Sequence, residues 1–182
     1  LLNLLSGIDL ADAGSIIIAG NNLSLMSEQQ RTLFRRRHIG FIYQFFNLIP
    51  SLTASENIAL ILELNGTEIS AACAQALLML ESMGIADKAQ HFPAQLSGGE
   101  QQRVAIGRAL IHKPALVLAD EPTGNLDAQS GQLMLDLLHQ QVRQEGATLL
   151  LVTHSLAVAR SADRILTLEH GVVEERRGDF AW

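Results

Sequence analysis

Two adjacent carboxylates, Asp120 and Glu121, are the residues of this sequence best placed to do chemistry. They follow the apolar run ALVLA (115–119) and precede Pro122. Such a run is typical of a parallel strand that is covered on both faces, and ligands of parallel sheets bind beyond the carboxyl ends of the strands. Asp120 could hold Mg²⁺ there, and Glu121 could accept a proton from a water that attacks a phosphate. Taken alone, the pair fits equally well a surface loop in which proline ends the strand.

A second motif, LSGGEQQR (96–103), combines a helix start with two glycines. Ser97 and Glu100 have the spacing of a capping box, which predicts that a helix begins here. Gly98 and Gly99 leave the first turn open to close approach, and the N–H groups and dipole of a helix N-terminus attract anions. A well-capped helix after a loop is the alternative interpretation, but the whole string lies just before the first motif, which favours an anion site.

Composition and charge exclude several classes of protein. The chain has 182 residues, of which 48% are hydrophobic and 18% charged, so we expect a single folded domain and exclude a disordered chain. It carries 13 Lys and Arg against 19 Asp and Glu, a net charge of -6 that argues against a nucleic-acid partner. Every apolar run is shorter than the roughly 18 residues of a membrane helix, so we expect no direct insertion into a membrane. The single cysteine, Cys73, fits a reducing compartment.

Helix and strand signals alternate along the chain, which predicts an α/β fold with a parallel sheet. Strands are expected at 15–20, 38–44, 115–119 and 147–152, the last two fully buried, followed by a hairpin at His170–Gly171. Helices are expected at the opening LLNLLSG and at about 27–37, 53–64, 70–83, 100–112, 128–143 and 156–160. Residues 53–97 hold helices but no strand, so we predict a helical insertion there, within one domain that spans 1–182.

Local patterns refine these elements. Capping boxes are predicted where Ser27 precedes Gln30 and where Thr53 precedes Glu56. The helix at 70–83 should bury Leu77, Leu80 and Met83 on one face. The basic run at 35–37 is expected to be a solvated helix end, and the tail EERRGDFAW (174–182) shows no clear structure.

Five segments resemble, in the family's order, the motifs of ATP-binding cassette (ABC) ATPases. Gln44 in FIYQ resembles the Q-loop glutamine, LSGGEQQR the signature motif, and ALVLADEP the Walker B motif with its catalytic glutamate. GNLD (124–127) resembles the D-loop, and His154 in LLLVTHS the switch histidine. The resemblance implies a P-loop NTPase-like fold with a mostly parallel sheet and helices on both faces. The run YQFFNLIPSLTASENI is further similar to the lipoprotein-releasing and macrolide-exporting transporter ATPases.

The resemblance implies a role for each matching residue, with ATP and Mg²⁺ as ligands. Glu121 would be the general base, His154 would hold the γ-phosphate and the attacking water, and Gln44 with Asp120 would complete the shell of the metal and the water. Residues implied in nucleotide binding are Ser97, Gly98, Gly99, Glu100, Asp120, Asn125 and Asp127. Among these, the serine and the two glycines of the signature would contact a γ-phosphate held by a partner chain.

The resemblance also implies partners and a location. Two copies would pair head to tail and act with transmembrane transporter subunits, in the cytoplasm and peripheral on the inner face of the cell membrane. The apolar stretch FFNLIPSLT (45–53) would then help form a groove for a cytoplasmic helix of the membrane partner. Local packing onto the helical insertion is the alternative for this stretch.

The start of the sequence departs from the family pattern. In these ATPases a helix such as LLNLLSG directly follows the Walker A loop, GxxGxGK(S/T). That loop makes most of the contacts that bind the phosphates. This sequence does not contain that loop, so we expect a chain truncated at its N-terminal side that neither binds ATP tightly nor hydrolyses it. The alternatives are a non-transport ABC ATPase of DNA repair, chromosome organisation or translation, and a non-catalytic interaction fragment.

Overall fold

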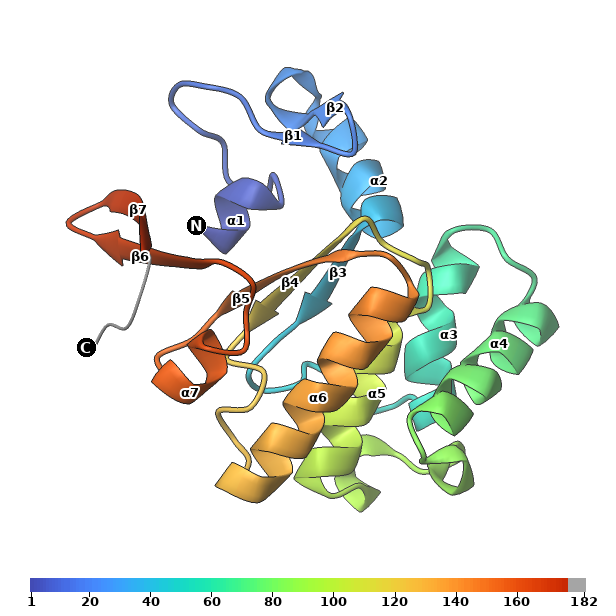
Figure 1. Ribbon diagram of the computed structural model, residues 1–182. Helices are drawn as coiled ribbons and strands as arrows, with labels where there is room; N and C mark the ends of the chain where they lie inside the picture. Colours follow the sequence, from blue (N-terminus) through green and yellow to red (C-terminus); the bar gives the residue numbers. More distant parts are fainter. Residues whose placement is uncertain (177–182) are drawn as a thin grey trace.

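Three parallel strands form the centre of the structure, a computed structural model that describes residues 1–176 (Figure 1). They are β3 (Ile39–Ile42), β4 (Leu116–Asp120) and β5 (Thr148–Val152), with β4 in the middle. The pairs Ile39 with Leu116 and Leu116 with Thr148 set the register, so all three strands end at the same edge of the sheet. The predicted α/β class with a parallel sheet is confirmed.

Helices cover both faces of this sheet. Because successive side chains along a strand point to opposite faces, neighbouring residues of β4 join different clusters. Val117 and Ala119 of β4 join a hydrophobic cluster with α5 (Gly98–Leu110) and α6 (Ala128–Gln144). Leu118, which lies between them, joins a second cluster with α2 (Glu28–His38). The middle strand is therefore buried on both faces, as its apolar sequence predicts.

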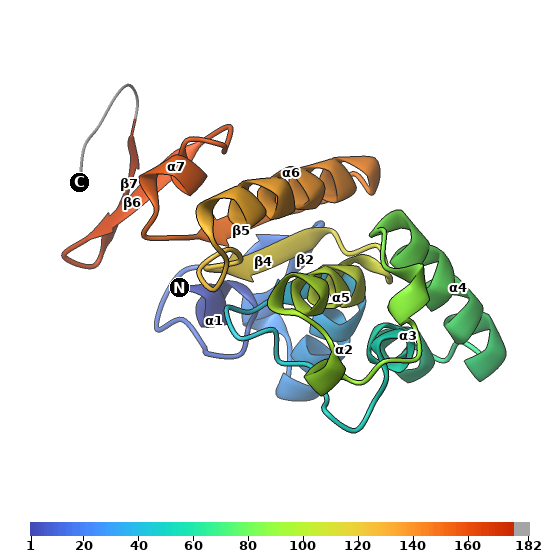
Figure 2. The ribbon, with the colours of Figure 1, turned by 90° about the horizontal axis from the view of Figure 1, so that it is seen from below.

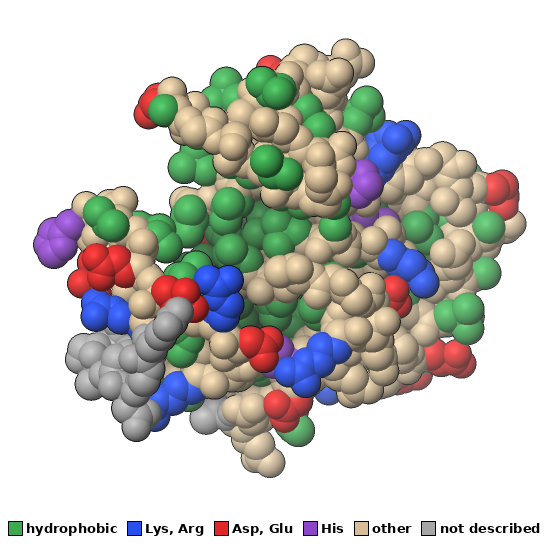
Figure 3. Space-filling model, turned by 45° about the horizontal axis from the view of Figure 1, so that its top comes forward, with side chains coloured by type: hydrophobic (Ala, Val, Ile, Leu, Met, Phe, Trp, Pro, Cys, Tyr) green, Lys and Arg blue, Asp and Glu red, His purple; other side chains and the backbone are tan. Residues whose placement is uncertain are grey.

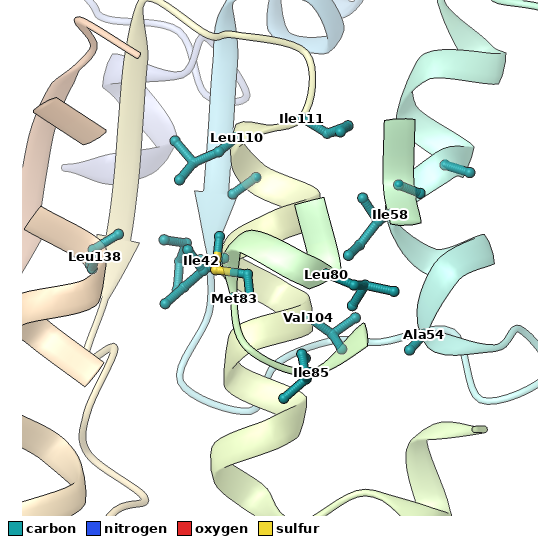
Figure 4. Close-up of a cluster of buried hydrophobic side chains, with 14 of the residues drawn as sticks. Ile42, Ala54, Ile58, Leu80, Met83, Ile85, Val104, Leu110, Ile111 and Leu138 are labelled. Carbon is teal, nitrogen blue, oxygen red and sulfur yellow. The ribbon is translucent and has the colours of Figure 1, made fainter. Parts of the chain in front are cut away.

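A pair of helices, α3 (Ala54–Leu64) and α4 (Ile69–Ser82), packs against α5 at one side of the sheet. Figure 2 shows this pair on one side of the molecule and the hairpin of β6 (Ile165–Glu169) and β7 (Val172–Arg176) on the opposite side. Buried side chains of α3, α4 and α5, among them Ile58, Leu80 and Val104, meet in one cluster (Figure 4). The remaining elements are α1 (Leu2–Leu5), α7 (Leu156–Ala159), β1 (Ile17–Ile18), β2 (Asn21–Asn22) and three short 3-10 helices, Leu23–Leu25, Ala86–Lys88 and Pro93–Gln95. No helix in the described part of the chain is long and apolar enough to span a membrane.

The structure corrects the strand expected at 15–20. Within this run only Ile17–Ile18 forms a strand, and it pairs with Asn21–Asn22 in an antiparallel hairpin outside the central sheet. The chain reverses at Ala19 and Gly20, whose φ angles of 48° and 75° are both positive, as a tight hairpin turn requires. Positive φ values of 51° and 82° likewise form the predicted turn at His170–Gly171.

The structure also corrects the exposure of β5. The run at 147–152 was expected to be a buried strand, but all five residues of β5 are at least partly exposed. β5 lies at one end of the three-stranded sheet, with β4 as its only paired strand among residues 1–176. Figure 3 shows hydrophobic side chains gathered at the centre of one face of the molecule.

Smaller differences concern single side chains and the tail. Leu77 of α4 is 46% exposed, because the buried stripe instead continues from Leu80 to Ala76, one full turn before it. Residues 174–176, expected to have no clear structure, form the end of β7, and 177–182 lie outside the described residues. In the basic run, Arg35 and Arg36 are half-buried and only Arg37 is exposed, so the expected solvated helix end is wrong for two of the three.

Close packing of β3 on α5 requires Gly40. A Cβ atom at this position would lie 2.2 Å from the backbone carbonyl oxygen of Ala109. We expect Gly40→Ala to lower the free energy of unfolding by roughly 3 kcal/mol, the upper end of the usual overpacking cost, because backbone cannot yield as a side chain can. Urea unfolding measures this, with Gly131→Ala as a control. Outside the backbone of its own helix, the Cβ of an alanine at position 131 would meet no atom of the described residues closer than 3.5 Å, and alanine favours a helix. Wild-type stability of Gly40→Ala would contradict the packing described.

Candidate functional site

The carboxyl ends of the three parallel strands bring together residues that are far apart in the sequence (Figure 1). Asp120 is the last residue of β4, and Glu121 follows it. Gln44 lies two residues beyond the end of β3, rather than at the strand end itself, and His154 lies two residues beyond β5. The structure therefore places these four predicted site residues at one edge of the sheet.

Glu121 is held at this edge by both its backbone and its side chain. Its N–H donates to the carbonyl oxygen of Val152 at 2.9 Å, and its φ of 44° lies in the left-handed region. Non-glycine residues adopt that conformation at some cost, which folded proteins often accept at functional sites. The carboxylate accepts hydrogen bonds from the hydroxyl of Thr153, at 3.0 Å, and from the backbone N–H of His154. Each carboxylate oxygen retains lone-pair capacity for a water.

The GNLD segment (124–127) lies against Gln44 and Glu121. The N–H of Gly124 donates to the carbonyl oxygen of Glu121 at 3.0 Å, and the side-chain amide of Asn125 donates to the backbone carbonyl of Gln44. A Cβ on Gly124 would lie 3.3 Å from the side-chain Nε2 of Gln44, so that side chain reaches the same loop. Gln44, Glu121 and Asn125 thus belong to one connected group, which we call the strand-end group.

The signature segment forms the N-terminus of α5, apart from the strand-end group. The predicted capping box is present: the Ser97 hydroxyl accepts from the N–H of Glu100 at 3.3 Å, and the Glu100 carboxylate accepts from the N–H of Ser97 at 2.7 Å. The carboxylate of Glu100 accepts from the N–H of Ser97 and, at 2.9 Å, from its hydroxyl, and these two hydrogen bonds, the one from the N–H foremost, hold the pKa of Glu100 below its usual value. Apart from the nearby backbone of the helix itself and the adjacent residues, no heavy atom of residues 1–176 lies within 4 Å of a Cβ built on Gly99, and a Cβ on Gly98 would meet only one ring atom, at 3.9 Å. The first turn of this helix is open to a ligand.

Two further acidic residues of the predicted site differ in their surroundings. The Asp127 carboxylate caps α6 by accepting from the N–H groups of Gln129 and Ser130, at 3.1 and 3.0 Å. Hydrogen bonding by Ser130, first through its side chain and then through its N–H, lowers the pKa of Asp127, and the N–H of Gln129 adds to this effect. Asp120, in contrast, is exposed, and its carboxylate makes no hydrogen bond or ion pair within residues 1–176.

The oxygen donors at the strand ends suit Mg²⁺. The free carboxylate of Asp120 and the side-chain carbonyl of Gln44 are hard oxygen ligands of the kind that Mg²⁺ accepts, with water and phosphate oxygens completing its shell. Glu121 lies next to Asp120 but is committed to hydrogen bonds with Thr153 and His154. The arrangement therefore separates a residue that can bind a cation from one that can accept a proton.

Sequence reasoning missed two residues of this region. Thr153 donates to Glu121 and accepts from the N–H of Ser155, and its position directly before His154 was a signal that could have revealed it. Arg108 on α5 donates to the backbone carbonyls of Phe46 and Asn47, which are 62 and 61 residues away in the sequence. No local sequence pattern predicts a contact between residues that are so far apart in the sequence.

Known proteins resemble this chain over most of its length. The family model described as ABC transporter matches residues 1–124. An uncharacterized ABC transporter ATP-binding protein of Mycobacterium tuberculosis is 52% identical over 171 residues, which cover 94% of this chain and 69% of that protein. The lipoprotein-releasing system ATP-binding protein of Xanthomonas campestris pv. campestris is 43% identical over 175 residues, which cover 96% of this chain and 73% of that protein.

A solved structure agrees with the sequence matches. An ATP-binding cassette determined as a dimer in a post-hydrolysis state, with ADP and Pi bound, superposes with a TM-score of 0.83 at 38% identity. The match covers 98% of this chain and 80% of that one. Sequence, motif order and fold agree, and this chain belongs to the ABC transporter family of ATP-binding proteins.

Proposed function

We propose that this chain is the ATP-hydrolysing subunit that powers a membrane transporter of the exporter or lipoprotein-releasing type. The observation that carries the proposal is the strand-end group, in which Glu121 lies beside the switch position His154 and is linked through the GNLD loop to Gln44. The identity with the lipoprotein-releasing system ATP-binding protein supports the transporter type.

The proposed roles follow from the positions of these side chains. Glu121 accepts the proton of the attacking water, and His154, whose side chain is exposed at the same edge, binds the γ-phosphate and orients that water. Asp120 and Gln44 would hold the metal of the nucleotide through their oxygens. When bound, Mg²⁺ neutralises charge that develops on the phosphates. Positioning and electrostatics then supply most of the catalysis, as is usual for phosphoryl transfer.

The signature segment is proposed to act on a second copy of the chain. Ser97, Gly98 and Gly99 lie at an open helix N-terminus, where backbone N–H groups and the helix dipole favour a phosphate. They would meet the γ-phosphate held by the partner, with Glu100 fixing the turn through the capping box. Asn125 and Asp127 of the GNLD segment would join the two nucleotide sites across the dimer. The dimeric form of the solved relative supports this arrangement.

The proposed partner is a transmembrane subunit at the inner face of the cell membrane. Residues 53–97, which include α3 and α4, would act as the helical subdomain that faces it together with the apolar stretch at 45–53. A polypeptide of residues 1–182 alone would bind ATP weakly, because it contains no Walker A sequence. Hydrolysis is expected of a form of the protein that carries that loop.

Reconstitution tests the transporter assignment. The intact protein is purified in mild detergent together with the integral membrane protein that accompanies it. The purified complex is then placed in liposomes that contain a fluorescent triacylated peptide. We expect ATP-dependent release of the peptide to an acceptor protein, and no release when Glu121→Gln is present. Copurification with DNA or ribosomes in place of a membrane protein would instead establish the non-transport alternative and overturn the proposal.

A further inference from the structure

Helix α4 is apolar on two opposite faces, although only one of them is covered. The covered face holds Ala72, Ala76 and Leu80, which are all 0% exposed and belong to one hydrophobic cluster with side chains of α3 and α5. On a surface helix of a globular protein the opposite face normally carries polar and charged side chains. Glu81 is the single charged residue of α4, so the outward face of this helix departs from that rule.

Four exposed apolar residues lie along the outward face, namely Ala71, Ala74, Leu77 and Leu78, and we call them the α4 surface. Spacings of three, four and seven positions place them on one side of the helix. Leu77 and Leu78 are 46% and 65% exposed, and the two alanines beside them leave space for larger side chains of a partner. Figure 2 shows α4 at the margin of the molecule, where a partner could reach this face.

Negative charge flanks the α4 surface at both ends. Glu68 is the N-cap of α4 and Glu81 lies in its last turn, thirteen residues or about 20 Å further along the helix. Both residues are exposed, and neither forms an ion pair within residues 1–176. Residues 38–87 contain no Lys or Arg. Arg103 of α5 reaches the end of α4 but donates there to the carbonyl oxygen of Met83. The surface therefore offers apolar contact between two carboxylates that lack a cation.

These charges decide which kind of molecule fits the α4 surface. A second copy of the chain would bring Glu81 against Glu68 or Glu81 of the other copy, and like charges that face each other are destabilising. Anionic lipids of a membrane would meet the same two carboxylates and be repelled. A helix with basic side chains at both ends of an apolar stripe would instead gain two ion pairs and cover the apolar residues. A cation near Glu81 would also offset the unfavourable position of that charge at the C-terminus of α4.

We propose that the α4 surface binds an amphipathic helix of a partner protein, whose apolar side chains cover the surface and whose Lys or Arg at each end pairs with Glu68 and Glu81. This binding site is separate from the strand-end group and from the stretch at 45–53 that is proposed to face the membrane subunit. It therefore implies a further protein partner, and it does not depend on hydrolysis of ATP by this chain.

Fluorescence anisotropy with two labelled helical peptides tests the charge of the partner. One peptide carries a leucine stripe with Lys at two positions thirteen residues apart, and the matched peptide carries Glu at those positions. We expect the Lys peptide to bind residues 1–182 about tenfold more tightly than the Glu peptide, because two attractions replace two repulsions. The preference should shrink as salt is raised, since salt screens exposed charges.

Variants test whether the peptides bind at α4. Glu81→Gln and Glu68→Gln should each lower the preference about threefold, and together they should abolish it. Leu78→Gln should weaken the binding of both peptides about tenfold, because it removes an apolar contact while glutamine keeps the helix propensity of leucine. Glu28→Gln and Leu133→Gln are matched controls that should change neither affinity, since both residues are exposed and lie outside α4.

Equal affinity for the Lys and Glu peptides would overturn the proposal, as would a preference that persists when both acidic residues are replaced. Light scattering and vesicle flotation test the other occupants. A dimer of residues 1–182 that Leu78→Gln dissociates would assign the surface to a second copy, and binding to anionic vesicles that Leu78→Gln abolishes would assign it to a membrane. Either result would refute the proposal. If thermal melting shows that Glu68→Gln, which alters the cap of α4, does not fold, Glu81→Gln decides the outcome.

Discussion

Glu121→Gln, in a form of the protein that carries a Walker A loop, is expected to reduce ATP turnover by about 100-fold or more while ATP remains bound. Glutamine keeps the shape of the side chain and can still accept from the N–H of His154, but it cannot take a proton from water. Removing a general base typically costs about 10²–10⁴-fold in rate. Phosphate release measures turnover, and retention of labelled ATP on a filter measures the trapped complex.

A matched substitution separates this effect from a general loss of charge. Glu145, at the end of α6, pairs with Lys113 at 3.4 Å and lies outside the strand-end group. Glu145→Gln should therefore keep wild-type turnover. If Glu121→Gln hydrolyses ATP at the wild-type rate, the proton-accepting role belongs to another group.

Residues 1–182 alone are expected to show no saturable binding of ATP and Mg²⁺ at micromolar concentrations. Their only lysines are Lys88 and Lys113, and neither stands in a glycine-rich loop. Each hydrogen bond to a charged phosphate contributes about 1.5–3 kcal/mol, so two such bonds from a Walker A segment already correspond to about 100-fold in affinity. Titration with labelled ATP compares this polypeptide with one extended by a GxxGxGK(S/T) segment.

The lysine of that segment provides the control. An extended polypeptide in which this lysine is alanine should lose much of the affinity that the extension restores, because the lysine supplies the charge that contacts the phosphates. Micromolar affinity of residues 1–182 by themselves would show that the strand ends hold nucleotide without the loop, and would refute the expectation.

Local hydrogen bonding explains why many elements could be predicted from the sequence. The capping boxes at Ser27, Thr53 and Ser97 all form, because each needs only residues three positions apart. Met134 and Leu138 of α6 are both buried, because side chains four residues apart lie on the same face of a helix. Where partners are near in sequence, or where helical periodicity alone decides which face is buried, the pattern suffices.

The failures have two causes, a local turn in one case and partners that are distant in sequence in the others. The run at 15–20 is β-branched enough for a central strand, yet the turn at Ala19–Gly20 pairs it with its own neighbour. The apolar strand β5 is only partly buried because it lies at one end of the three-stranded sheet, and its position there depends on pairing with β4. Among candidate site residues, motif order predicts Gln44 and Glu121, whereas Arg108 contacts carbonyls about sixty positions away, which no local pattern indicates.

We propose that the signature segment of one copy completes the nucleotide site of another copy. The molar mass of the protein in solution tests this proposal most directly. Light scattering is measured on Glu121→Gln protein that carries the Walker A loop, with ATP and Mg²⁺ and then with ADP. We expect a dimer with ATP, a monomer with ADP, and a monomer under both conditions once Ser97→Arg blocks the open first turn of α5. A monomer with ATP, or a dimer that persists in Ser97→Arg, would contradict the account.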